Sequence, residues 1–204
     1  MFFSFDGIDG VGKSTQVDLF CQWLSEQGRK VCRCRDPGST PLGDRVREIL
    51  LHSSVDTPIA PRSEMLLYMA ARAQLVEEVI GPALARGEWV VSDRYLLANV
   101  VYQGHAGGLS PEVIAQVGEV AVAGVYPDCV ILLDLDPASA AERIDGPGDR
   151  MESRGDAYRV RLRAGYLKEA QADPARIHVV DASQTIEKVH ADVRRVAEQA
   201  LRST

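Results

Sequence analysis

The chain has 204 residues, 46% of them hydrophobic, and a formal net charge of −6 at pH 7. This length suits one α/β domain with a sizeable core, and no stretch has the composition of a linker, so we expect a single domain over residues 1–204. The acidic balance argues against a nucleic-acid partner, because proteins that bind polyanions carry a basic excess. A small anionic ligand would need only a local basic pocket.

The sequence shows no basic leader, no long apolar span and no lipidation signal, so we expect a cytoplasmic protein without a membrane partner. Cys21, Cys32, Cys34 and Cys129 fall within expected helices or strands and lack the spacing of a metal site. We therefore expect them to be buried, reduced thiols.

Short apolar runs recur along the chain, with helical stretches between them. The expected strands are residues 1–6, 30–35, 89–92, 129–134 and 177–181. The expected helices are residues 15–27, 42–52, 63–86 with an interruption at Pro82, 111–123, 138–143, 156–172 and 186–201. This alternation predicts an α/β fold with a five-stranded parallel sheet flanked by helices on both faces. Functional residues are expected beyond the carboxyl ends of the strands.

After the first expected strand, residues 7–14 read GIDGVGKS and match the phosphate-binding pattern G-x-x-x-x-G-K-[ST]. Glycines allow backbone N–H groups to wrap a phosphate chain, and the next helix contributes its positive end. Lys13 supplies a point charge, and the Ser14 hydroxyl can bind Mg²⁺. The flanking strand and helix argue against a chance match and predict a P-loop NTPase fold. The expected ATP-binding residues here are Gly7, Asp9, Gly10, Val11, Gly12, Lys13, Ser14 and Thr15.

Charged residues also follow the second and third expected strands. A turn at residues 35–40 is followed by Arg45 and Arg47, and Asp93 and Arg94 come after the third strand. A second anion site facing the phosphate loop is what a kinase for a nucleoside monophosphate requires. A switch GTPase is disfavoured because no Asn-Lys-x-Asp signature is present, and an ATP-driven machine usually needs further domains.

Six segments occur in the order and spacing of thymidylate kinases, which the chain resembles over nearly its whole length. They are residues 7–14, 35–38, 66–72, 93–95, 102–104 and 149–152. The resemblance implies transfer of the ATP γ-phosphoryl group to dTMP with Mg²⁺, giving dTDP for dTTP synthesis, by a homodimer. A related kinase for another deoxynucleoside monophosphate is one alternative. A nucleotide-binding switch protein is the alternative from another class.

The resemblance also assigns roles to the residues that carry the reaction. Arg94 would hold the acceptor phosphate, with Asp93 near the metal and the reacting oxygens. Asp9 would meet the sugar 3′-hydroxyl. Arg72 would contact thymine, and Tyr68 would stack on the base. The expected catalytic residues are thus Lys13, Asp93, Arg94 and Arg150, and the expected metal ligands are Ser14 and Asp93.

The remaining assignments concern the sugar, the base and the acceptor turn. Tyr102 would crowd the 2′ position and favour deoxyribose, whereas Asn99 and Gln103 would make polar contacts with the base. Arg47 matches a basic position common in the family, while Arg45 does not. The acceptor-binding residues are expected to be Asp9, Asp36, Pro37, Arg47, Tyr68, Arg72, Arg94, Asn99, Tyr102 and Gln103.

A lid is expected at about residues 145–155, where three glycines and a proline stand among charges. The phosphate loop carries no arginine, which is typical of bacterial members whose lid supplies several. Arg150 is the residue expected to reach the phosphoryl group, and its removal should lower kcat by something like 10² to 10⁴. Arg143, assigned to ATP binding, and Arg154 are weaker alternatives. A plain surface loop is the other interpretation of this segment.

Several of these residues have a purely structural alternative. Tyr68 and Arg72 lie four apart on one expected helix and could form an ordinary surface pair. Asp93 and Arg94 could pair with each other, and Tyr102, in an apolar stretch, could belong to the core. Two further acidic residues, Asp134 and Asp136, could simply end a strand and cap the following helix.

Overall fold

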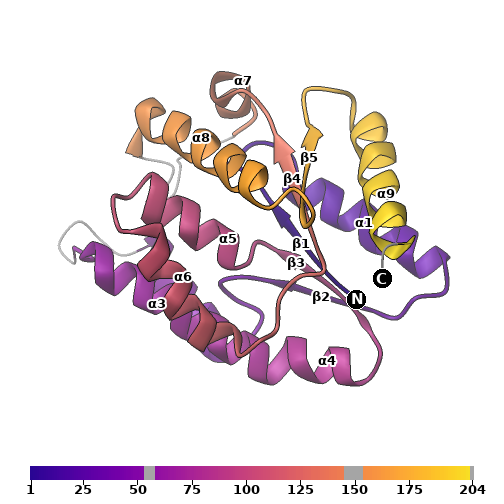
Figure 1. Cartoon of the computed structure of the whole chain (residues 1–204), viewed down its shortest axis with the longest axis horizontal. Coiled ribbons are helices and arrows are strands. Elements are labelled where there is room, and N and C mark those ends of the chain that lie inside the picture. The colour runs from indigo at the N-terminus through magenta and orange to yellow at the C-terminus, as the bar shows by residue number, and fades with distance from the viewer. Residues whose placement is uncertain (53–57, 145–153, 203–204) are drawn as a thin grey trace.

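The computed structural model describes residues 1–52, 58–144 and 154–202. Five strands form one parallel sheet in the order β2-β3-β1-β4-β5 (Figure 1). The strands are β1 (Phe2–Asp6), β2 (Val31–Arg35), β3 (Trp89–Asp93), β4 (Cys129–Asp134) and β5 (Ile177–Asp181). The expected five-stranded parallel sheet is confirmed, and each strand differs from its predicted range by one residue or less at either end.

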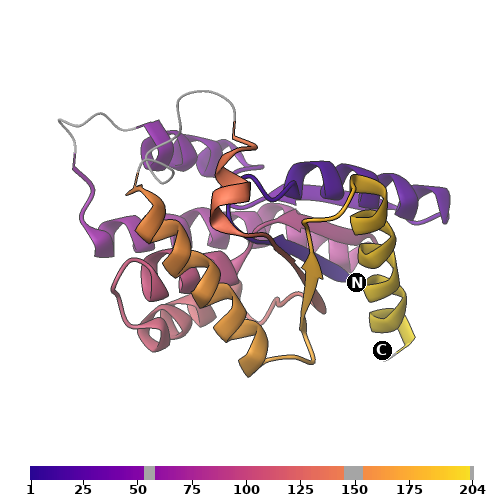
Figure 2. The same cartoon turned by 90° about the horizontal axis from the view of Figure 1, so that it is seen from above.

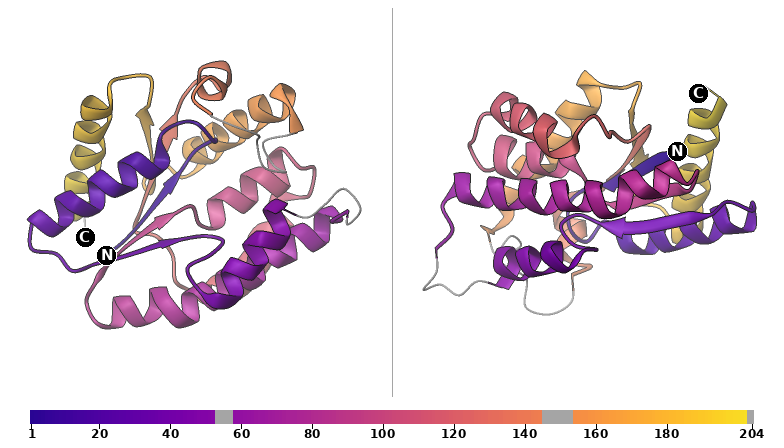
Figure 3. Two further views of the ribbon diagram at one scale, coloured as in Figure 1. Left: turned by 180° about the vertical axis from the view of Figure 1, so that it is seen from behind. Right: turned by 90° about the horizontal axis from the view of Figure 1, so that it is seen from below.

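Helices cover both faces of the sheet (Figures 1 and 2). One face carries α1 (Lys13–Glu26) and α9 (Ile186–Arg202), which pack against each other. The other face carries α3 (Pro61–Leu75), η1 (Val76–Ile80), α4 (Gly81–Ala85), α5 (Leu96–Asn99), η2 (Val100–His105), α6 (Pro111–Val122) and α8 (Asp156–Ala172). Two helices lie near the strand ends: α2 (Pro41–His52), packed on α3, and α7 (Pro137–Ala141), which follows β4 (Figure 3).

The central strand β1 is buried along its whole length, as expected for a parallel strand covered on both faces. Phe3 and Phe5 point to the α1 side, where Phe20 packs against both rings at centroid distances of 5.1 and 5.3 Å. The alternating residues Ser4 and Asp6 are also fully buried, although they are polar. A buried carboxylate at the end of the central strand places a charge next to the phosphate loop.

The sequence analysis missed the helix that runs from α5 into η2. Residues 96–105 are apolar or buried on several sides, so no single apolar stripe marks them as a helix. The expected interruption at Pro82 is also different in the structure. The helix continues through η1, where the Gly81 N–H donates to the Val76 carbonyl, and Pro82 falls in the first turn of α4, where its missing N–H costs little.

The cysteines are free thiols, as expected, but only Cys34 and Cys129 are fully buried. Cys21 and Cys32 are half-buried, and Cys32 lies on β2, an edge strand with a neighbouring strand on one side only. Within the described ranges, no helix is long and apolar enough to cross a membrane. Most of the expected lid, residues 145–153, lies outside the described residues.

Candidate active site

The phosphate loop joins β1 to α1 at the carboxyl end of the sheet. Gly10 adopts a φ of 85°, and a Cβ added there would lie 2.0 Å from the Ala140 carbonyl oxygen. Gly7 is equally constrained, since a Cβ would lie 2.5 Å from the Leu133 carbonyl oxygen. The loop therefore packs its backbone directly against the end of β4 and against α7, which only glycine permits.

A cavity of about 650 Å³ opens over this loop. Its walls come from the phosphate loop, from the ends of β2 and β3, and from the segment after β5. The lining residues that had been expected to bind ATP, Mg²⁺ or phosphate are Asp9, Gly10, Val11, Gly12, Lys13, Ser14, Thr15, Asp36, Arg47, Asp93, Arg94 and Arg143. These side chains thus gather beyond the carboxyl ends of the strands, where functional residues were expected.

Lys13 lies almost buried inside the loop. Its ammonium donates to the carbonyls of Gly7 and Ile8 at 3.1 and 2.7 Å and faces the Asp9 carboxylate at 3.4 Å. Burial and the neighbouring Arg94 lower the pKa of Lys13, while Asp9 opposes this shift. The loop backbone therefore fixes the ammonium at the floor of the cavity.

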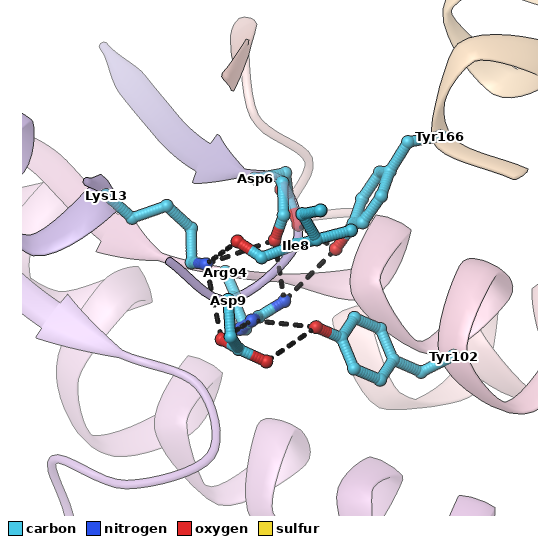
Figure 4. A network of polar contacts seen from close by, with 8 residues as sticks. Asp6, Ile8, Asp9, Lys13, Arg94, Tyr102 and Tyr166 are labelled. Carbon is cyan, nitrogen blue, oxygen red and sulfur yellow. Dashed lines mark hydrogen bonds and ion pairs between the residues drawn. The ribbon is translucent and has the colours of Figure 1, made fainter. Parts of the chain in front are cut away.

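Arg94 is the centre of the polar network at the end of β3 (Figure 4). Its guanidinium donates to Asp9 at 2.5 Å, to the Tyr102 hydroxyl at 2.9 Å, to the Tyr166 hydroxyl at 3.1 Å and to the Gly7 carbonyl at 3.2 Å. Its backbone has a φ of 68°, a strained conformation for a residue with a side chain. The surrounding contacts hold Arg94 in this conformation and do not support an exclusive pairing with Asp93.

Asp9 lies between two cations. Although burial acts to raise its pKa, Arg94 and Lys13 together hold the pKa of this carboxyl well below its usual range. The Tyr102 hydroxyl donates to its second oxygen at 2.9 Å. Asp9 is therefore an ionised carboxylate at neutral pH that can accept a further hydrogen bond.

A smaller cavity of about 80 Å³ adjoins the larger one. The two share Asp9, Asp36, Arg47 and Arg94, so the phosphate loop and the second pocket meet at Arg94. The smaller cavity brings together all ten residues that were expected to bind the acceptor: Asp9, Asp36, Pro37, Arg47, Tyr68, Arg72, Arg94, Asn99, Tyr102 and Gln103.

Arg72 forms the buried end of the smaller cavity. Its Nε donates to Asp36 at 2.5 Å and one terminal nitrogen donates to the Tyr95 carbonyl at 3.3 Å, so it is not part of a solvent-exposed pair with Tyr68. Arg47 donates to the Pro37 carbonyl at 3.2 Å and faces both cavities, whereas Arg45 is exposed. Helix α2, tied to the turn at residues 35–40 by this hydrogen bond, therefore presents Arg47 to both cavities.

The lid arginines have different surroundings. Arg143 lines the larger cavity and donates to the Ala182 carbonyl at 3.2 Å. Arg154 lines neither cavity and instead pairs with the buried Glu64 at 2.8 Å. Arg150 lies outside the described residues.

The acidic residues at and just after the end of β4 make structural contacts. Asp136 caps α7 by accepting from two backbone N–H groups, and Asp134 accepts two hydrogen bonds from Arg163 of α8. Both contacts agree with the structural alternative considered for these residues.

The sequence analysis did not identify three contributions to the site. The segment after β5, with Gln184 and Thr185, lines the larger cavity. It would have been found by looking beyond the carboxyl end of β5, as was done for the other strands. Tyr166 contacts Arg94 from α8, 72 residues further along the chain. Glu64 is buried on α3, a position where a charged residue signals a polar network.

The fold and the site define a P-loop phosphotransferase-like protein in which a second, cationic pocket faces the phosphate loop. The family model for thymidylate kinase matches residues 5–193, so the chain belongs to the thymidylate kinase family.

Two curated relatives and one solved structure show how far this similarity extends. Thymidylate kinase of Bifidobacterium longum subsp. infantis is 46% identical, over 99% of this chain and 88% of the relative. The enzyme of Thermosipho africanus is 40% identical over the full length of both. The crystal structure of thymidylate kinase from Ehrlichia chaffeensis has a TM-score of 0.78 at 30% identity and covers 97% of this chain and 98% of that one.

We predict that Asp6→Asn becomes more stable relative to wild type as the pH rises. Burial raises the pKa of Asp6 from 3.8 to about 6, although Arg94 and Lys13 oppose the shift. The folded protein therefore keeps a proton that the unfolded chain has lost, and its stability falls across this window, whereas asparagine does not ionise. Urea denaturation between about pH 4 and pH 7 should show the difference in free energy of unfolding changing by up to about 3 kcal/mol. A difference independent of pH would contradict this prediction.

Proposed function

We propose that this protein transfers the γ-phosphoryl group of ATP to dTMP, forming dTDP and ADP. Membership of the thymidylate kinase family supports this reaction. The observation that carries it is the junction of two cavities of about 650 and 80 Å³ at Asp9 and Arg94. A triphosphate chain in the larger cavity and a monophosphate from the smaller one would meet there.

The donor phosphates would lie on the phosphate loop, with their charge facing Lys13 and the N-terminus of α1. Ser14 and Asp93 both line the larger cavity and offer the oxygen ligands that Mg²⁺ prefers. When bound, Mg²⁺ would neutralise charge on the β- and γ-phosphates. Arg143 would contact ATP from the opposite wall, and Arg150 remains the predicted lid residue at the transferred group.

The acceptor phosphate would lie against Arg94 and Arg47, which approach the shared part of the two cavities from different elements. Phosphoryl transfer needs positioning and charge stabilisation more than covalent catalysis, so fixed cations at this junction suit the reaction. The ionised Asp9 can accept a hydrogen bond from the 3′-hydroxyl and orient the sugar. Asp93 therefore does not have to act as a strong base in this reaction.

The smaller cavity would hold the base. Tyr68 offers a ring for stacking, and Arg72 offers donors at the buried end. Asn99 and Gln103 line the same wall and are themselves hydrogen-bonded to each other. Its buried, polar walls suit a single small nucleobase.

A coupled assay of ADP release tests this proposal directly. With ATP and Mg²⁺, we expect dTMP to be preferred over dUMP, dCMP, dAMP, dGMP and UMP. Preference for another acceptor would keep the kinase but overturn the assignment of the base pocket. Binding of ATP without any acceptor-dependent ADP release would instead support a nucleotide-binding switch.

The Tyr102 ring should determine the preference for deoxyribose. Tyr102→Ala removes the ring and should lower the preference for dTMP over ribothymidine monophosphate by about tenfold, because space opens for the 2′-hydroxyl. Tyr102→Phe is the matched control: it loses the hydroxyl contacts with Asp9 and Arg94 but keeps the ring. It should lower kcat/KM for both acceptors and leave their ratio unchanged. An unchanged ratio in Tyr102→Ala would remove this residue from sugar selection.

A homodimer and a cytoplasmic location belong to the same proposal. The free thiols suit a reducing compartment. For the dimer, the adjacent helices α3 and α6 expose apolar side chains around a shallow groove, with Leu66 53% and Val120 82% exposed. Contiguous apolar surface of this kind suits a protein interface.

Val120→Lys should convert the dimer into a monomer, because each copy would place a charge in the apolar contact. Sedimentation velocity should then give half the wild-type mass. Val160→Lys, at a position 57% exposed on α8, is the control and should leave the mass unchanged. A monomeric wild-type protein would rule out the proposed dimer.

A further inference from the structure

Three buried polar side chains form a chain of hydrogen bonds behind the smaller cavity. Glu64 on α3 is 2% exposed, Gln103 is 3% exposed and Asn99 is 1% exposed. The Gln103 amide nitrogen donates to Glu64 Oε1 at 2.8 Å, and the Asn99 amide nitrogen donates to Gln103 Oε1 at 2.7 Å. Arg154 pairs with the second Glu64 oxygen at 2.8 Å, so the buried carboxylate has a countercharge.

A carboxylate fixes the direction of every bond in this chain. An ionised Glu64 can only accept, so Gln103 must turn its NH₂ group toward it. The Gln103 carbonyl oxygen then points to Asn99, which must donate in turn. As a result, the Asn99 oxygen is the atom left over, and it is buried without a hydrogen-bond partner among the described residues. Without the carboxylate, the Gln103 and Asn99 amides could each adopt either orientation.

The wall of the smaller cavity therefore carries a defined pair of groups. Asn99 and Arg72 both line this cavity; the Asn99 oxygen is an acceptor without a partner among the described residues, and Arg72 contributes donors. The guanidinium has five N–H groups, of which those directed at Asp36, Met69 and Tyr95 account for three. A base that offers a carbonyl oxygen beside a ring N–H complements this arrangement, as thymine and uracil do at O4 and N3. Cytosine presents the reverse pattern, an amino group beside an unprotonated ring nitrogen.

We propose that Glu64 is a positioning residue that selects 4-oxo pyrimidines over cytosine by fixing the orientation of the Gln103 and Asn99 amides. The inference rests on the proposed function, because it places the nucleobase in the smaller cavity. Glu64 reaches the base only through two other side chains. The carboxylate matters because it can only accept hydrogen bonds, whereas an amide of the same shape could also donate one.

Glu64→Gln tests this role with almost no change in volume. The amide that it introduces can donate to the Gln103 oxygen, which lets both existing amides turn over and presents the Asn99 NH₂ group to the cavity. Calorimetric titration should show the ratio of Kd for dCMP to Kd for dTMP falling by about tenfold or more. The ratio for dUMP to dTMP should stay constant, because both bases have the same O4 and N3 edge.

Two further variants test the chain of hydrogen bonds from Glu64 through Gln103 to Asn99, which we call the relay, separately from the ion pair beside it. Arg154→Gln removes the ion pair but keeps the acceptor-only carboxylate, so it should retain the wild-type ratio of dCMP to dTMP. Gln103→Met breaks the relay without reversing it and should reduce this ratio even if Glu64→Gln does not fold. An unchanged ratio in either relay variant, or equal weakening for all three nucleotides, would overturn the proposal.

Binding and turnover distinguish this inference from the proposed function. If wild-type protein binds dTMP more tightly than dCMP and the relay variants reduce this preference, but neither nucleotide causes ADP release, the kinase assignment fails and the relay stands. If it phosphorylates dTMP and the relay variants keep its selectivity, the relay fails and the kinase assignment stands.

Discussion

The site depends on the contact between Arg94 and Asp9. Two partly buried charges lie 2.5 Å apart at the junction of the cavities, and Lys13 adds a third charge at 3.4 Å from Asp9. Isolated charges at this depth would be strongly unfavourable, whereas each of these has an opposite charge and several hydrogen bonds. The result is a cluster of charges whose geometry is already set where two phosphates would meet, so Lys13 and Arg94 are ordered before any ligand binds.

The same contact explains the irregular backbone around it. Arg94 has a φ of 68°, and the phosphate-loop glycines at Gly7 and Gly10 also have positive φ. Strain of this kind persists only where the surroundings fix it, and here the Arg94 guanidinium is bonded to the Gly7 carbonyl while its backbone carbonyl accepts from Ser92. The end of β3 and the start of the phosphate loop are thus tied together. A strained residue at this position turns its side chain back over the loop.

Sequence patterns predicted most of this arrangement because they report on the backbone. Strand periodicity and the glycine motif are local signals, and parallel strands place their ends together, so Lys13 and Asp93 could be expected at one edge. Tyr166 and Glu64 could not be found in this way. Their roles depend on how α8 and α3 pack, and neither lies in a local motif. The helix at 96–105 was missed because burial on several sides removes the period that marks an amphipathic helix.

Helix α8 and the residues just before it contact three residues in or behind the smaller cavity. Arg154, two residues before the start of α8, contacts Glu64, and in the first turn of α8 the Tyr158 hydroxyl donates to the Tyr102 carbonyl at 2.9 Å. Two turns beyond, Tyr166 accepts from Arg94. Two of these contacts come from α8 itself and one from the chain just before it, and they reach Glu64, Tyr102 and Arg94. Because a helix moves nearly as a rigid body, any shift of α8 would alter its contacts with Tyr102 and Arg94 together, so these two residues of the smaller cavity share one physical support.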